Sequence, residues 1–403
     1  MTETKRTRRT RTRRKPEAEE LPALEKISEV QTKVQSLAGE LNSILINRRR
    51  EIDGLLVALL AREHCLLLGP PGTAKSALTE LLCRSIDGAK HFSWLMSKFT
   101  VPEELFGPFS LAGLKQDRFE RMVKGKLPEA DIAFLDEIFK ANSSILNNLL
   151  TLINERRFAN GTQTLRCPLQ TMVGASNELP EGKELGALYD RFLVRFWVGY
   201  LTDRSERMAL LKMPKSGSVK GKINLQELEE AQNEAENIHI SDEMFNLLLD
   251  CQEALGREGF VCSDRRWRKT LKILRAKAYL DGYQEVMPRH FDILADSLWH
   301  EPNDRLELQR IILKTCNPNA AKIQKILDIA ESSFQAIPMD QQIPESEVST
   351  VFTQMIEVNA DLRKQLEALH KIKTPEAKEA AQKVNDMIEE IGRYTRGITG
   401  LRM

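Results

Sequence analysis

Apolar and polar residues alternate along this chain in two patterns, which predict two kinds of element. Between residues 24 and 60 the apolar positions return every three or four residues, and this spacing predicts two helices. Four short apolar runs predict strands instead, and they span residues 65–68, 131–137, 171–177 and 192–201. Each of the last three runs leads into polar residues.

Helical patterns separate these strands. The clearest spans residues 142–155, where five apolar side chains share one face: Ile145, Leu146, Leu149, Leu150 and Ile153. Alternating strands and helices predict an α/β fold, a mostly parallel sheet covered by helices on both faces. Ligands bind such sheets beyond the carboxyl ends of the strands, so we expect the polar strand ends to converge there.

The pattern changes after residue 212. Residues 213–222 combine Pro, Gly, Ser and Lys, which predicts a linker or flexible loop, and the spacing beyond them is helical. We therefore expect four parts: a basic disordered arm over 1–21, an α/β domain over 22–212, an all-helical domain over 223–303 and a helical extension over 304–403.

Two helices are expected near the end of the extension. The first has apolar residues at helical spacing from Met355 to Leu369, and the second from Val384 to Ile391. Thr374 and Pro375 predict the N-cap and first turn of the second helix. The short break between the two helices predicts an antiparallel hairpin.

Composition alters this picture only at the N-terminus. Apolar residues make up 41% of the chain and charged residues 29%, as in ordinary globular proteins, and the formal net charge is only +1. However, eight of the eleven residues from Lys5 to Lys15 are Lys or Arg. We predict that this arm is disordered and that it could contact nucleic acid.

Other sequence signals suggest a cytoplasmic protein. No stretch approaches the roughly 20 consecutive apolar residues of a membrane span, and no apolar segment follows the basic arm as in a signal peptide. The six cysteines are scattered without a C-x-x-C pair, which predicts reduced, buried thiols rather than a disulfide framework or a zinc site.

A glycine-rich segment directly follows the first predicted strand. It reads Gly69-Pro70-Pro71-Gly72-Thr73-Ala74-Lys75-Ser76-Ala77 and is almost a P-loop, with Ala74 where the common pattern has glycine. A strand that leads through such a turn into a helix N-terminus can bind a polyphosphate with its backbone N–H groups. Lys75 would then reach the β- and γ-phosphates, and the Ser76 hydroxyl would bind Mg²⁺.

Acidic residues close the next predicted strand. Asp136 lies 61 residues after Lys75, and Glu137 follows it. An aspartate at a strand end can hold Mg²⁺ through water, and an adjacent glutamate can act as general base on the attacking water. The simpler alternative is a pair of acidic residues that starts a loop.

Asn177 ends the following strand, where its amide could hydrogen-bond both the γ-phosphate and the attacking water. A turn-forming asparagine is the simpler alternative.

Three arginines are further candidates. Arg191 is either a partner for Asp190 or an arginine finger for the γ-phosphate of a neighbouring subunit. Arg195 competes weakly for the finger role, because it alternates with apolar residues and is expected to face solvent. Arg265 opens a long helix that Ser263 or Asp264 would cap, and it is either a solvated helix start or an arginine that closes onto the nucleotide.

Over residues 26–300 these motifs resemble the MoxR branch of the AAA+ ATPases, and most closely the RavA group. The resemblance rests on residues 69–76, 99–108, 134–141, 145–156, 175–180, 188–192 and 261–267. It implies that residues 69–76 are Walker A and that Asp136 and Glu137 are Walker B. By the same resemblance Asn177 is sensor 1, Arg191 the arginine finger and Arg265 sensor 2, with ATP and Mg²⁺ as ligands. The family often has Ala-Lys in Walker A, so Ala74 fits this branch.

The resemblance also implies how such a protein works. It implies a ring, commonly a hexamer, that hydrolyses ATP between subunits and acts like a chaperone on protein clients, with a partner that carries a von Willebrand factor A domain. Residues 99–126, with Gly107, Gly113 and Gly125 as turn points, would be an insertion that contacts clients. Residues 157–170 would form a second one, a hairpin around Asn160 and Gly161.

One feature departs from the RavA pattern. RavA-like proteins can carry a β-rich module near the C-terminus, and residues 306–403 have no strand-rich block. Two alternative functions stay open at this point: a nucleic-acid-associated ATPase that uses the basic arm, and a nucleotide-dependent assembly scaffold with slow hydrolysis.

Overall fold

The computed structural model describes residues 27–212, 219–316, 318–337, 348–372 and 375–399. The predicted basic arm at 1–21 therefore lies outside the described residues, and so do Thr374 and residues 213–218 of the predicted linker.

A five-stranded sheet lies at the centre of the chain, with the strand order β3-β4-β7-β1-β8. All neighbouring strands run parallel, which confirms the predicted α/β fold. The strands are β1 (Cys65–Leu68), β3 (His91–Leu95), β4 (Ile132–Asp136), β7 (Thr171–Ser176) and β8 (Val194–Trp197). β8 is shorter than the predicted run over 192–201, and β3 was not predicted.

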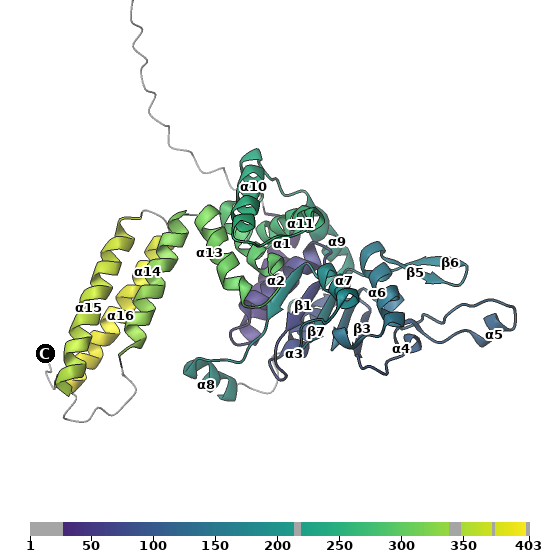
Figure 1. Cartoon of the computed structure of the whole chain (residues 1–403), viewed down its shortest axis with the longest axis horizontal. Helices are drawn as coiled ribbons and strands as arrows, with labels where there is room; N and C mark the ends of the chain where they lie inside the picture. Colours follow the sequence, from purple (N-terminus) through teal and green to yellow (C-terminus); the bar gives the residue numbers. More distant parts are fainter. Residues whose placement is uncertain (1–26, 213–218, 317, 338–347, 373–374, 400–403) are drawn as a thin grey trace, which may run out of the picture.

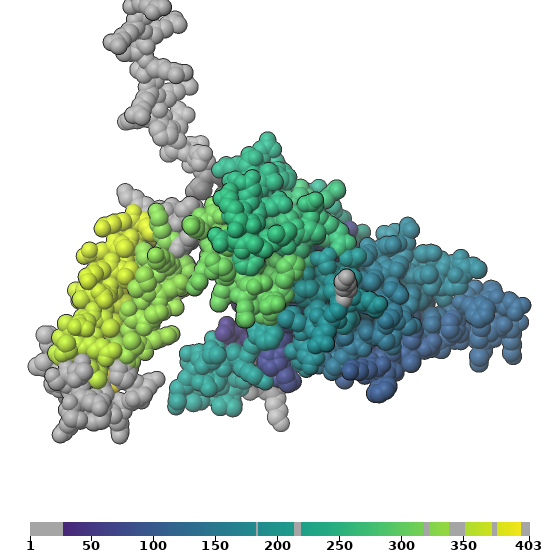
Figure 2. Space-filling view, viewed as in Figure 1, coloured from purple at the N-terminus to yellow at the C-terminus, as the bar shows by residue number. Residues whose placement is uncertain are grey.

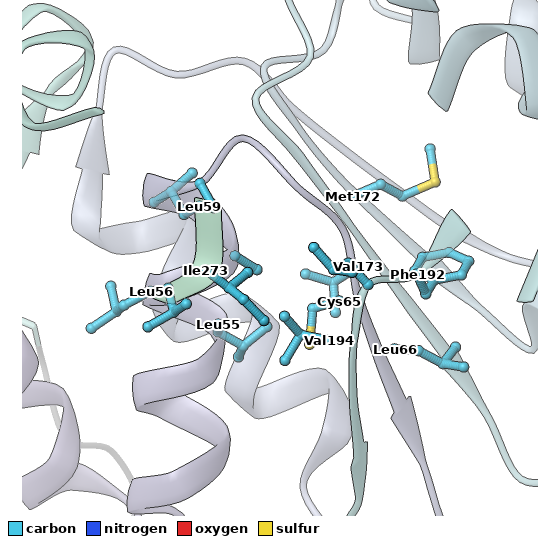
Figure 3. Packing of buried hydrophobic residues seen from close by; sticks show 14 of the residues in the cluster. Leu55, Leu56, Leu59, Cys65, Leu66, Met172, Val173, Phe192, Val194 and Ile273 are labelled. Carbon is cyan, nitrogen blue, oxygen red and sulfur yellow. The ribbon is translucent and has the colours of Figure 1, made fainter. Parts of the chain in front are cut away.

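Helices flank this sheet. They are α1 (Glu29–Ile44), α2 (Arg49–Leu60), α3 (Lys75–Ser85), α6 (Ser143–Glu155) and α7 (Lys183–Arg191), and α1 and α2 are the two helices predicted between residues 24 and 60. Every residue of β1 and β7 is buried, which requires that both faces of the sheet be covered. Figure 3 shows that Cys65 and Val194 point towards Leu55 of α2, whereas Leu66, the next residue of β1, points to the opposite side, where Phe192 at the end of α7 also lies.

Short elements connect the sheet to its surroundings. They are β2 (Ile86–Asp87), α4 (Pro102–Phe106), α5 (Leu111–Leu114), η1 (Leu127–Glu129), η2 (Ile138–Lys140), α8 (Arg204–Lys212) and β9 (Ile223–Asn224), and β9 pairs in parallel with β2.

Two insertions project from the same side of the α/β domain (Figure 1). β5 (Arg157–Asn160) and β6 (Gln163–Arg166) form the predicted antiparallel hairpin around Gly161. The Asn160 side chain bonds the backbone of Arg121 at 2.5 and 3.1 Å, which ties the hairpin to the 99–126 insertion. Of the three glycines expected to turn that insertion, Gly107 and Gly125 have left-handed φ angles of 93° and 71°. Gly113 instead lies within α5, so its prediction as a turn point is wrong.

The predicted helical domain contains α9 (Leu225–Glu236), α10 (Asp242–Arg257), α11 (Asp264–Leu280), η3 (Pro288–Leu294), α12 (Ala295–Leu298) and α13 (Asp304–Cys316). By the predicted division at 303/304, α13 alone of these elements belongs to the C-terminal extension. However, it packs against α10 and η3, and its residues Leu308 and Ile312 are buried in the same core. Packing therefore extends the helical domain beyond the predicted division at 303/304.

The C-terminal helices form a bundle with its own core. α14 (Pro318–Gln335) packs against α15 (Val348–His370) and α16 (Pro375–Thr399), so the predicted hairpin of α15 and α16 is completed by a third helix. Its buried residues include Met355, Leu362, Leu369 and Val384. Figures 1 and 2 show the bundle beside the helical domain, on the opposite side of the molecule from the projecting insertions. Within the described residues, no helix is both long and apolar enough to cross a membrane.

Candidate active site

The backbone of the loop between β1 and α3 explains its residue types. Gly69 and Gly72 have φ angles of 145° and 78°, which glycine adopts without steric cost. A Cβ on Gly69 would lie 2.2 Å from the backbone oxygen of Val198, whereas one on Gly72 would meet no atom within 4 Å. The space beside Gly72 is therefore open to a ligand, at the N-terminus of α3, where an anion is favoured.

Ala74 lies in the left-handed region as well, with φ 72° and ψ 21°, immediately before α3. This conformation is sterically unfavourable for a residue that has a Cβ atom, and glycine adopts it without that cost. The conformation therefore explains why the common pattern has glycine here. It also marks the loop as a strained segment, as is common at functional sites.

Lys75 is buried and points back over the loop. Its Nζ donates to the backbone oxygens of Gly69 at 2.6 Å and Pro70 at 2.9 Å, and to Oδ1 of Asn177 at 2.8 Å. Burial lowers the pKa of its ammonium. The next residue, Ser76, is exposed in the first turn of α3, and Ala77 is half-buried there.

The polar strand ends of β4 and β7 meet at Lys75. The Asn177 Nδ2 atom donates to Oε1 of Glu137 at 2.6 Å, so one amide connects Lys75 to Glu137. This confirms the predicted convergence for the ends of β4 and β7. We call Lys75, Glu137 and Asn177 the strand-end cluster.

Glu137 is held in an unusual way. Its backbone is left-handed, with φ 53°, and its Oε2 lies 3.2 Å from Nζ of Lys140 in η2. Lys140 was not among the predicted site residues, although an opposite charge three residues along the chain is a recognisable signal for a local ion pair. Both carboxylate oxygens of Glu137 are thus engaged, which fixes the direction of its side chain.

The oxygen atoms near the cluster suit a hard divalent cation. Asp136 ends β4 half-buried, and its Oδ1 accepts from the backbone N–H of Glu137 at 2.9 Å. Carboxylate and hydroxyl oxygens from Asp136 and Ser76 are the ligand types that Mg²⁺ prefers. The described residues contain no group of three or more His, Cys, Asp or Glu that could hold a metal. Mg²⁺ is usually held by one or two protein oxygens together with water and phosphate, so the oxygens of Asp136 and Ser76 fit this ion.

A second cluster lies where α7 meets α11. Asp190 Oδ2 contacts Arg265 Nη2 and lies 3.7 Å from Arg191 Nη1, and its Oδ1 lies 3.3 Å from Arg266 Nη1. We call these four residues the arginine cluster. Burial would raise the pKa of Asp190, but Arg266 and Arg265 outweigh it and hold the pKa below its ordinary value.

The arginine cluster carries more positive than negative charge. Three guanidinium groups share one carboxylate, and Nε of Arg191 is buried with no hydrogen-bond partner. Burial and the nearby Arg265 lower the pKa of Arg191. An unpaired buried donor is costly, so an incoming anion would be stabilised here.

Arg195 does not face solvent as predicted. It is completely buried, and its three nitrogens donate to the backbone oxygens of Phe192, Trp299 and Tyr189 at 3.1, 2.6 and 3.1 Å. Burial and the charge of Arg266 lower its pKa to about 9. Because all its nitrogens are engaged within the chain, Arg195 joins the helical domain to the sheet and cannot reach a neighbouring subunit.

Arg265 lies in the first turn of α11, which Ser263 caps as predicted by accepting from the N–H of Arg266 at 3.3 Å. Its side chain is half-exposed and bound to Asp190. Arg191 and Arg265 thus come together. None of their described contacts reaches the strand-end cluster.

Family models match two parts of the chain. Residues 32–238 match a model described as the MoxR domain in the MoxR-vWA-beta-propeller ternary systems. Residues 227–312 match an AAA lid domain, which includes most of α13.

The chain is also similar to individual known proteins. An uncharacterised protein of Methanocaldococcus jannaschii is 41% identical over 306 residues, 76% of this chain and 79% of that protein. Chaperone MoxR1 of Mycobacterium tuberculosis is 29% identical over 186 residues, 43% of this chain and 46% of that protein. A crystal structure of an ATPase candidate from Cytophaga hutchinsonii shares the fold, with a TM-score of 0.58, 18% identity, and coverage of 71% of this chain and 94% of the other.

Proposed function

Because the chain belongs to the MoxR family of AAA+ ATPases, we propose that it hydrolyses ATP to ADP and phosphate and uses this reaction to remodel or assemble protein clients. The observation that carries the proposal is the hydrogen-bonded connection from Lys75 through Asn177 to Glu137 beside the open space at Gly72. Phosphoryl transfer requires mainly positioning and charge stabilisation, and this cluster offers both. The narrower grouping with RavA stays a prediction.

Each residue of the site has a distinct task in this proposal. The loop over 69–74 and Lys75 bind the phosphates, and Lys75 exchanges its bonds to Gly69 and Pro70 for phosphate oxygens. Ser76 and Asp136 hold Mg²⁺, which neutralises phosphate charge when it is bound. Glu137 accepts a proton from the attacking water, and Asn177 orients that water and contacts the γ-phosphate.

Hydrolysis in this proposal needs a second copy of the chain. Arg191 and Arg265 make no described contact with the strand-end cluster, and they retain unmatched positive charge. A ring, a hexamer by resemblance, would bring this arginine cluster to the γ-phosphate that a neighbour binds. Arginines supplied in this way stabilise the charge of the transition state.

Two further observations support a protein client and a partner. The name of the matched family model mentions a vWA component, and one relative is named a chaperone, so we propose a partner with a von Willebrand factor A domain. The 99–126 insertion exposes large apolar side chains that could contact a client in the cytoplasm: Phe99, Leu111, Phe119 and Met122.

Two variants test the chemistry. Glu137→Gln should bind ATP as the wild type does but release phosphate at least about 10²-fold more slowly, because the base is lost. Lys75→Ala should lose ATP binding itself, measured by nucleotide titration. Glu155→Gln, an exposed glutamate at the end of α6, is the matched control and should hydrolyse ATP normally. Unchanged turnover in Glu137→Gln would contradict the assignment of the base.

The same variant tests the purpose of hydrolysis. Glu137→Gln held in its ATP state should trap its client, so affinity purification from the native cell should recover a defined protein and the vWA partner. Recovery of nucleic acid, lost when residues 1–20 are removed or salt is raised, would favour the alternative role of the basic arm.

A further inference from the structure

Two cysteines that are distant in sequence meet inside the helical domain. Cys251 of α10 and Cys316 of α13 are 65 residues apart, and their Sγ atoms lie 3.0 Å from each other. Two sulfur atoms that merely pack together stay farther apart than this. The contact is therefore close enough for the two atoms to bond with little movement of either helix.

The surroundings hold this pair in place. α10 and α13 pack directly on one another, Cys251 is completely buried, and Cys316 is 9% exposed. All six cysteines are free thiols in this structure. The contact with Cys251, together with burial, raises the pKa of the Cys316 thiol, so little of it is thiolate and its reaction with an oxidant is slow.

We propose that Cys251 and Cys316 form an oxidation site that closes an intramolecular disulfide, with a peroxide as the oxidant. Cys316 has the exposed surface, so its sulfur attacks one oxygen of the peroxide and the O–O bond breaks. The S–H proton joins the leaving hydroxide, and a sulfenic acid and water form. The Cys251 sulfur then attacks the sulfenic sulfur, and a second water leaves. In sum, two thiols and one hydrogen peroxide give one disulfide and two waters.

The bond would fasten a functionally important part of the chain. The loop that it closes contains α11, with Arg265 and Arg266, and also Trp299, whose backbone oxygen binds Arg195. Cross-linking a loop of this length stabilises the folded state mainly by restricting the unfolded chain. The inference does not depend on the proposed ATPase function, because it concerns the stability of the helical domain.

Peroxide treatment of the full chain tests the site. The intact mass should fall by two hydrogen atoms, and digestion under non-reducing conditions should yield one linked pair of peptides that contain Cys251 and Cys316. The midpoint of thermal unfolding should rise by roughly 5 °C and return after a reductant is added. Cys251→Ser and Cys316→Ser should each lose both effects.

Cys262→Ser is the matched control, since Cys262 is a half-buried cysteine between the two in sequence and its Sγ contacts the backbone oxygen of Leu298. This variant should form the disulfide as the wild type does. The proposal would be overturned if peroxide left six alkylatable thiols, linked Cys262 instead, or oxidised the thiols to sulfinic acids without a cross-link. Measurements on the wild-type chain alone decide among these outcomes, so a poorly folding variant does not affect the result.

Discussion

The strand-end cluster and the arginine cluster are built in different ways. The strand-end cluster lies at the edge of one sheet, and backbone conformation places its groups, with Ala74 and Glu137 both in the left-handed region. Its charged and polar atoms largely satisfy one another. The arginine cluster joins α7 to α11 from another domain, and one carboxylate faces three guanidinium groups. The polar groups of the strand-end cluster thus find their partners within the chain, whereas the arginine cluster keeps unpaired positive charge that could bind an anion.

Two arginines four residues apart show the same difference. Arg195 is completely buried with three backbone oxygens as acceptors, whereas Arg191 retains a buried Nε that has no partner. Residue type therefore says little here, and the number of acceptors that surround each guanidinium decides its role. Three substitutions test this comparison, in order of expected effect.

The largest effect is expected for Arg191→Ala. Turnover should fall by about 10³-fold, because the charge that stabilises the transition state is lost, while ATP binding stays normal. Steady-state phosphate release and nucleotide titration measure the two quantities. Arg257→Ala removes an exposed arginine of α10 that pairs with Glu253, and it should leave turnover unchanged.

Mixing variants shows whether Arg191 acts on a neighbour. Subunits with Arg191→Ala bind ATP, and subunits with Lys75→Ala retain the arginine. A mixture should therefore recover part of the activity that each lacks alone. If no ratio of the two restores turnover, the arginine cluster does not act on a neighbouring copy. The difference between the two clusters would then not reflect a site shared between subunits.

An intermediate effect is expected for Arg195→Met, and on stability rather than chemistry. The substitution leaves the buried oxygen of Trp299 without its donor and removes one of the two donors to the oxygen of Tyr189, which should lower the free energy of unfolding by about 3 kcal/mol. Urea denaturation measures this loss. Under conditions where the variant stays folded, Arg195→Met subunits are mixed with Lys75→Ala subunits. This mixture should release phosphate as fast as a mixture of wild-type and Lys75→Ala subunits. If Arg195→Met instead lost turnover while remaining as stable as the wild type, Arg195 rather than Arg191 would be the arginine that acts on the γ-phosphate.

The smallest effect is expected for Ala74→Gly. Glycine adopts the left-handed conformation at this position without strain, although it also makes the unfolded chain more flexible. The free energy of unfolding should therefore rise by only about 0.5 kcal/mol, with ATP binding retained. Ala209→Gly, an exposed position within α8, is the matched control and should lower it by about 1 kcal/mol. Equal losses in both variants would show that Ala74 is not strained.

Much of the fold and the strand-end cluster could be predicted, because local patterns specify them. A continuous apolar run that ends in polar residues identifies a buried parallel strand and the edge at which its polar end lies, as in β4 and β7. β3 was not predicted because it lacks a continuous apolar run. It is an edge strand in which only Phe92 is buried.

Features that depend on distant contacts could not be predicted. Arg195 occupies an alternating pattern typical of a half-exposed strand, yet Trp299 of the helical domain covers it. The apolar spacing of α13 shows a helix but not which neighbour it packs against, and most of its packing is on α10 and η3, with less on α14 of the C-terminal bundle. The Cys251–Cys316 contact likewise depends on that packing.

The sequence by itself determined the groups that stand at the ends of the predicted strands: the loop at 69–74, Lys75, Asp136, Glu137 and Asn177. These lie at the ends of neighbouring parallel strands, and hydrophobic period and strand direction place such ends together. Tertiary structure alone decided which arginine is available and which is structural. That distinction depends on the acceptors that a second domain brings to each guanidinium, and no local spacing encodes them.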